Sequence, residues 1–119
     1  MPNEDKGKTI TLTAAADYSA AAARYFPVKI TGANEFTACA AGEKSVGFAQ
    51  LPAKQYEADQ IMINGITFAK ASAAISAGAD IAAAGTYKIR TANGTTDNVI
   101  GIALSAATAD GDIISVLIR

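Results

Sequence analysis

Histidine and tryptophan are both absent from this chain of 119 residues. Without histidine, the chain lacks the usual general base, the commonest zinc ligand and every Ser-His or Cys-His nucleophile pair. A single cysteine, Cys39, excludes an intramolecular disulfide. These absences argue against an enzyme, and we expect no catalytic residue, no metal site and no cofactor.

An excess of one charge is also missing, because ten basic residues stand against eleven acidic ones along the chain. No basic stripe is present to neutralise phosphates, so we expect no nucleic-acid partner. No apolar run approaches the roughly 20 residues of a membrane span. The polar start, residues 1–6, is unlike a secretory signal. We therefore expect no membrane partner and synthesis in a cytoplasm.

Hydrophobic residues make up half of the chain, but 28 residues are alanine, which buries little surface. Such a thin core is often supplemented by self-association or by a large binding surface. The length fits one domain. We expect a flexible N-terminal arm over residues 1–7, where Pro2 and Gly7 accompany charged residues, and a single β-domain over residues 8–119.

Alternation of polar and apolar residues is the main secondary-structure signal. It predicts strands at intervals of roughly 8–12 residues, which is typical of a sandwich or barrel. Residues 14–24 are ambiguous: we favour a turn leading into a strand, with one short helix as the alternative. Residues 51–58 contain Pro52 and long polar side chains and are expected to form a loop. The expected fold is a small all-β sandwich or barrel with at most short helical turns. The predicted strands cover residues 8–13, 28–31, 35–40, 46–50, 60–63, 66–71, 81–83, 86–91, 99–104 and 113–118.

Two halves of the chain resemble each other. Gly47 and Gly101 each interrupt a short apolar strand, and each strand is followed by an aspartate, Asp59 or Asp112, that opens a second apolar run. A glycine inside a strand marks a bend or a close backbone approach. We therefore expect two related β-units, approximately residues 8–68 and 69–119.

Three short patterns have a chemical reading and a structural one. Cys39 lies on an alternating strand without an activating base, so we expect a buried, inert thiol. Asp110-Gly111-Asp112 lacks the further oxygen ligands of a calcium loop and is read as a turn. Asn93-Gly94-Thr95 matches a glycan acceptor but is expected to be a hairpin turn.

Lys70 provides an alternative function. Lipoyl and biotinyl carrier domains are also small duplicated β-structures that present a lysine at a hairpin tip. Lys70 lacks the neighbouring residues typical of those domains, so a solvent-facing strand lysine is the favoured interpretation. A host-surface or carbohydrate-binding module is a further alternative, although the eight aromatic residues provide little surface for stacking against sugars.

The chain resembles the decoration, or cement, proteins that stabilise the heads of tailed bacteriophages. The resemblance covers nearly the whole chain, and the loop at residues 51–58 departs from it. Its motifs are Gly7 to Ala16, Phe26 to Asn34, Val46 to Ala49, Ile75 to Ala79, Ile100 to Leu104 and Gly111 to Leu117.

This resemblance implies a structural virion protein on the outer surface of the capsid. Its partner would be the major capsid protein, and the protein would self-associate as a trimer. An N-terminal segment, residues 2–13, would contact the shell by adding a strand to a capsid-protein edge, with Ile10 and Leu12 as apolar anchors. Deletion of residues 2–12 is expected to abolish binding and leave the domain folded. The predicted contact residues are Asn3, Lys6, Lys8, Thr9, Ile10, Thr11 and Leu12.

Overall fold

The structure, a computed structural model, describes residues 8–19 and 24–118. These residues form ten strands and no helix, which confirms the all-β prediction. None of them forms a helix that is long and apolar enough to cross a membrane. The strands are β1 (Thr9–Ala14), β2 (Pro27–Gly32), β3 (Glu35–Ala38), β4 (Gly47–Ala49), β5 (Ala58–Met62), β6 (Gly65–Lys70), β7 (Asp80–Gly85), β8 (Lys88–Thr91), β9 (Gly101–Ala103) and β10 (Ile113–Ile118).

The first five strands close into a small barrel in the order β1-β3-β2-β4-β5. All neighbours in it are antiparallel except β1 and β3, which run parallel and pair at Thr13–Glu35 and Ala14–Phe36. Closing the sheet leaves few unpaired strand edges. The expected loop over residues 51–58 lies between β4 and β5, although Ala58 itself begins β5.

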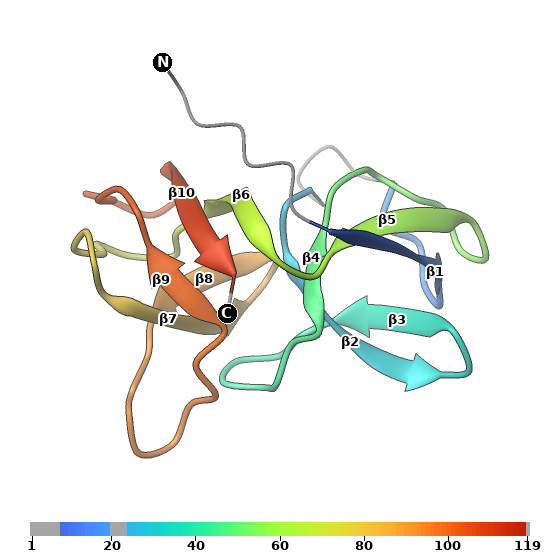
Figure 1. The fold of residues 1–119 in the computed structure, drawn as a ribbon, viewed down its shortest axis with the longest axis horizontal. Coiled ribbons are helices and arrows are strands. Elements are labelled where there is room, and N and C mark those ends of the chain that lie inside the picture. Colours follow the sequence, from blue (N-terminus) through green and yellow to red (C-terminus); the bar gives the residue numbers. More distant parts are fainter. Residues whose placement is uncertain (1–7, 20–23, 119) are drawn as a thin grey trace.

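The last five strands form a second sheet with the order β6-β10-β9-β7-β8. When β6 to β10 are matched with β1 to β5 in chain order, each strand has the same neighbours as in the barrel, read in the opposite direction. Ala71, just after β6, forms a parallel bridge to Ile89 of β8, as Ala14 does to Phe36 in the barrel. Figure 1 shows the two sheets side by side, joined where β5 leads into β6. We call β1–β5 the first module and β6–β10 the second module.

The strand pairings and bridges of the two modules occur at equivalent positions. Val28 pairs with Gly47 in the first module, and Ile81 pairs with Gly101 in the second. Outside the strands, Tyr18 bridges to Ala53 and Ile75 bridges to Ala107. The glycines therefore occupy equivalent positions. In the ambiguous region, Ala15 and Ala16 form a bend and Tyr18 a single β-bridge rather than a helix, and residues 20–23 lie outside the described residues.

The prediction that Asp59 and Asp112 occupy equivalent positions in the two modules is wrong. The carbonyl of Asp112 accepts a hydrogen bond from Ala71 N at 2.8 Å, and the equivalent bond runs from Ala14 N to the carbonyl of Glu57 at 2.9 Å. Asp112 is thus equivalent to Glu57, and Asp59 lies two residues further on, inside β5. The predicted boundary between the repeats, at residues 68 and 69, lies within β6. The division into one domain and an arm stays a prediction.

Two local predictions differ from the structure between residues 86 and 97. Thr86 and Tyr87, expected in a strand, have φ angles of 52° and 65° and form a left-handed turn before β8. Asn93 does begin a turn, in which its N–H donates to Asp97 Oδ2 at 3.0 Å. That turn is not a hairpin, because β7 lies between β8 and β9 in the sheet.

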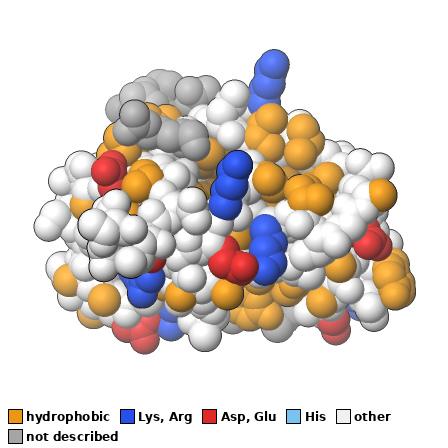
Figure 2. All heavy atoms as spheres, turned by 90° about the horizontal axis from the view of Figure 1, so that it is seen from below, with side chains coloured by type: hydrophobic (Ala, Val, Ile, Leu, Met, Phe, Trp, Pro, Cys, Tyr) orange, Lys and Arg blue, Asp and Glu red, His pale blue; other side chains and the backbone are white. Residues whose placement is uncertain are grey.

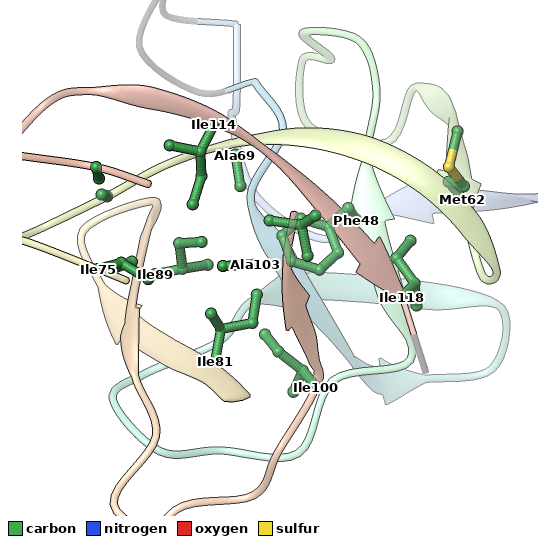
Figure 3. Packing of buried hydrophobic residues seen from close by; sticks show 13 residues of the cluster. Phe48, Met62, Ala69, Ile75, Ile81, Ile89, Ile100, Ala103, Ile114 and Ile118 are labelled. Carbon is green, nitrogen blue, oxygen red and sulfur yellow. The ribbon is translucent and has the colours of Figure 1, made fainter. Parts of the chain in front are cut away.

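The core has two clusters, one for each module, and each receives an aromatic side chain from the other module. Phe48 of β4 is fully buried and packs in the cluster of the second module, together with Met62. Figure 3 shows the Phe48 ring among the isoleucines and alanines of that cluster. In return, Tyr87 of the second module packs on Tyr18 and Phe26, with ring centroids 6.0 and 5.0 Å away. Burying a side chain such as Phe48 contributes about 1.5–3 kcal/mol, so these contacts hold the modules together.

Candidate functional site

The one thiol is not arranged for chemistry. Cys39 is buried, and its Sγ lies 3.5 Å from the carbonyl oxygen of Lys44. Burial raises the pKa of this thiol to about 11. A thiol that stays protonated is a poor nucleophile, which agrees with the predicted inert role.

The acidic turn serves the local backbone. Asp112 Oδ2 accepts hydrogen bonds from Thr108 N at 2.8 Å and from Thr108 Oγ1 at 2.9 Å. These bonds hold the pKa of Asp112 below its usual value. Asp110 pairs instead with Lys88 at 2.7 Å. Within residues 8–19 and 24–118, no group of three or more His, Cys, Asp or Glu side chains is arranged to hold a metal ion.

Asp59 is the one acidic residue among the described residues that is buried as a whole; the Asp97 side chain is also buried, but it pairs with Arg90. Its Oδ1 accepts a long hydrogen bond from Leu51 N at 3.3 Å, and its buried Oδ2 has no partner. Desolvation raises the pKa of this carboxyl. Among the described residues no side chain forms a hydrogen bond with Asp59, so the structure shows no second group with which it could divide acid and base roles.

Lys70 is not displayed as a carrier lysine would be. It is the last residue of β6, half-buried, and lies across from Ile113 of β10. β6 and β10 are far apart in the sequence, so Lys70 is not at the tip of a hairpin. The position fits the favoured interpretation of a strand lysine.

The residues predicted to contact a capsid are divided by the structure. Asn3 and Lys6 lie outside the described residues. Lys8 and Thr9 to Thr11 are exposed along the start of β1, with 39% of Ile10 accessible. Leu12 is only 6% exposed and belongs to the core of the first module, so it is not free to anchor a partner. The structure therefore leaves a shorter exposed segment than the sequence predicted.

β1 is also committed to the barrel. It pairs with β5 from Thr9 to Thr13, and with β3 only at Thr13 and Ala14. Within the described part of the chain, no strand pairs with the other edge of β1 over Thr9 to Leu12. A deletion that reached residue 12 would remove most of a barrel strand, so the predicted 2–12 truncation is not expected to leave the domain folded.

A broad apolar surface covers the outer side of the second sheet, which sequence reasoning missed. Ile66, Leu117 and Ile102 form a continuous row across β6, β10 and β9. Alternation along β10, with Ile114 and Val116 buried, already contained the signal that the intervening side chains face outward. We call this surface the second-sheet outer face; its residues are Ile66, Phe68, Ile102, Leu104, Ile113 and Leu117.

Aromatic contacts fix one margin of this face. The Tyr25 ring meets Phe68 edge to face at 5.7 Å, and the Arg24 guanidinium lies over Tyr25 at 4.9 Å. Phe68 is still 53% exposed. A large aromatic side chain held in place and open to solvent is typical of an interaction surface.

Charges of both signs are dispersed over the described surface, and six of the charged side chains form three ion pairs. Lys29 Nζ donates to both carboxylate oxygens of Glu43 at 2.8 Å, which raises the pKa of Lys29 and lowers that of Glu43. Arg90 pairs with Asp97 at 2.8 Å. Figure 2 shows charged side chains dispersed over one face, with hydrophobic side chains between them. This surface suits apolar packing better than recognition of a charged ligand.

Comparison with known proteins places this arrangement among phage proteins. A family model described as "Phage cement protein" matches residues 5–119. Among solved structures, the N base of the head fiber gp8.5 of bacteriophage phi29 is similar with a TM-score of 0.73. That similarity covers 94% of this chain and 93% of the other at 14% sequence identity. No protein with a curated description matches the chain.

Proposed function

Since this chain belongs to the phage cement protein family and is a phage structural protein, we propose that it binds the outer surface of a phage capsid and stabilises the expanded head. The observation that carries the proposal is the match of the family over residues 5–119. The two β-modules and the apolar side chains exposed on the described residues support it. We propose no enzymatic activity.

The physical mechanism is linkage. A protein that binds the expanded shell and has lower affinity for its disrupted state stabilises the shell by mass action. The partner is the major capsid protein of a tailed phage. Each contact can be weak, because many copies act on one particle. The protein is located on the capsid surface of the virion and is made in the cytoplasm of the bacterial host.

The capsid contact is proposed to lie on the N-terminal segment: Asn3, Lys6, Lys8, Thr9, Ile10 and Thr11. Lys8 to Thr11 are exposed, and the edge of β1 with which no described strand pairs is suited to accept or extend a strand. Leu12 supports the segment from the core rather than contacting the shell. We also propose that copies of the chain associate as a homotrimer, which places several such segments on one capsid site.

Cosedimentation with purified phage heads that lack this protein tests the proposal. Wild type is expected to pellet with the heads and to saturate. Deletion of residues 2–7, or Thr11→Glu in the exposed part of β1, is expected to weaken binding at least about tenfold. Tyr56→Asp is a matched control, because it changes an exposed residue outside the segment. Absence of wild-type binding would refute the function, whereas equal binding by all variants would refute the contact segment.

A further inference from the structure

Two surfaces meet where the modules of the chain pack together: the wall of the first module and one end of the sheet of the second module. On the wall side, in the first module, Phe48 lies on β4, Gln50 just after β4 and Met62 at the end of β5. Phe48 and Met62 pack in the core cluster of the second module, and Gln50 Nε2 donates to Thr67 Oγ1 at 3.0 Å. We call these three residues the wall face.

The second module meets the wall face with residues at one end of its sheet. Thr67 and Ala83 are buried there, and Ala83 O accepts a hydrogen bond from Gly42 N of the first module at 2.9 Å. Ile100 and Ile118 belong to the same cluster as Phe48 and are 4% and 7% exposed. We call Thr67, Ala83, Ile100 and Ile118 the end face.

The wall face has an open counterpart on the second module. Phe48 pairs with Met62 as Ile102 pairs with Leu117, so these residues are equivalent. Ile102 and Leu117 are only half-buried.

Gln50, the third residue of the wall face, also has a counterpart in the second module. Gln50 N donates to Gln60 O, and Leu104 N donates to Ser115 O, which makes Leu104 the counterpart of Gln50. Leu104 is 44% exposed. The open wall face is therefore apolar at all three positions and forms part of the second-sheet outer face.

The end face likewise has an open counterpart on the first module. Val46 N bonds to Val28 O as Ile100 N bonds to Ile81 O, so Val46 is the counterpart of Ile100. Val46 is 37% exposed, whereas Ile100 is buried.

The other end positions repeat this difference. Ile30 and Ala83 each precede the same bulge, and Ile30 is 48% exposed. Ile10 corresponds to Thr67 and is 39% exposed. Ile63, which follows Met62 as Ile118 follows Leu117, is half-buried. Each position covered in the second module thus has an aliphatic counterpart in the first that is exposed or, for Ile63, only partly buried.

We propose that these two open surfaces bind each other between copies of this chain. The open wall face of one copy, Ile102, Leu104 and Leu117, docks on the open end face of the next, Ile10, Ile30, Val46 and Ile63. The contact repeats the geometry that already joins the two modules within one chain. A second copy of this chain is therefore the partner whose surface fits each open face.

Side-chain chemistry matches at the corresponding contacts. The hydrogen-bonded pair Gln50 and Thr67 within the chain corresponds to Leu104 and Ile10 between copies. Both polar residues of that pair are thus replaced by aliphatic ones. An apolar pair at this position leaves no buried polar group without a partner.

A contact of this kind is heterologous, because the two surfaces differ. Heterologous contacts produce closed rings when the rotation between copies completes a circle, and filaments otherwise. Three copies in a ring would form a circle of six similar modules. The inference rests on the proposed self-association. Ile10 belongs also to the proposed capsid contact, so the interface is tested on the purified chain without phage heads.

Sedimentation velocity of the purified chain over a range of concentrations tests the interface. Wild type is expected to sediment as a closed species larger than the 12.1 kDa chain. Ile10→Lys and Leu104→Glu should each weaken association at least about tenfold, because each buries an unpaired charge. Both positions are exposed in the single chain, so circular dichroism should report an unchanged fold. Tyr56→Asp, outside both faces, should associate as wild type does.

Charge complementation makes the test specific. A double variant that carries Ile10→Lys and Leu104→Glu in one chain should recover association, because lysine of each copy then meets glutamate of the next at every contact of the ring. A wild-type chain that stays monomeric at every concentration overturns both the interface and the proposed trimer. Association that both variants retain overturns the interface alone. Monomeric wild type whose capsid binding is lost on Leu104→Glu would assign the open wall face to the capsid instead.

Discussion

Gly47 and Gly101 face the same obstacle in the two modules: the backbone carbonyl of the residue beside them on the neighbouring strand. A Cβ added to Gly101 would lie 2.5 Å from Leu117 O, and one added to Gly47 would lie even closer to Met62 O. The strands can approach this closely only because both residues lack a side chain. This repeated close approach is the strongest local mark of the duplication.

Alanine at either glycine should therefore destabilise the fold. Gly47→Ala and Gly101→Ala are each expected to lower the free energy of unfolding by about 2 kcal/mol, because the backbone must move apart. Urea denaturation followed by circular dichroism measures the change. Gly94→Ala is the control, since a Cβ there meets nothing within 4 Å. Equal stability of all three variants would show that the close approach is absent.

Phe48 should be a main stabilising contact between the modules. Phe48→Ala removes a fully buried ring from the cluster of the second module and is expected to cost about 3–5 kcal/mol. Ile102→Ala at the equivalent, half-exposed position should cost much less in the single chain. The comparison is made by chemical denaturation at a concentration where the chain is monomeric. Similar losses for the two variants would contradict the different burial of these equivalents.

Asp59 should reduce stability at neutral pH. Burial raises its pKa above 3.8, so the folded state resists ionisation more than the unfolded state does. This penalty is absent below pH 3.8 and is complete once the pH exceeds the folded pKa. Asp59→Asn is therefore expected to raise the melting temperature at pH 7 and to change it less at pH 3. An equal effect at both values would show that ionisation is not the cause.

Cys39 should resist alkylation in the folded protein. With its pKa raised to about 11 by burial, almost none of the thiol is ionised at pH 8. Iodoacetamide is expected to modify it slowly in buffer and rapidly in urea, as followed by intact mass. Rapid modification of the folded chain would place the thiol in a more open environment.

Strand content and duplication could be predicted from the sequence because both depend on local patterns. Alternation located β1, β6 and β10 to within a few residues, and Gly47 and Gly101 marked the equivalent strands. The pairing of Asp59 with Asp112 was wrong because loop lengths differ between modules, and only hydrogen bonds identified Glu57 as the counterpart.

The surfaces were harder to predict because burial depends on contacts between distant residues. Ile10 and Leu12 are two residues apart on β1 and therefore lie on the same face of the strand. Leu12 nevertheless lies in the core, whereas Ile10 lies at the exposed end of the strand. Phe48 and Ile102 occupy equivalent positions, but only Phe48 is covered by the other module. No local pattern distinguishes these cases, since the difference arises when the two modules pack together.

Heating phage heads with and without this protein tests the proposed function most directly. Heads that lack it are incubated with saturating protein, and release of DNA is followed as the temperature rises. Binding to the intact shell predicts release at a higher temperature, with an increase that grows as occupancy grows. Release at the same temperature from bare and saturated heads would contradict a stabilising role.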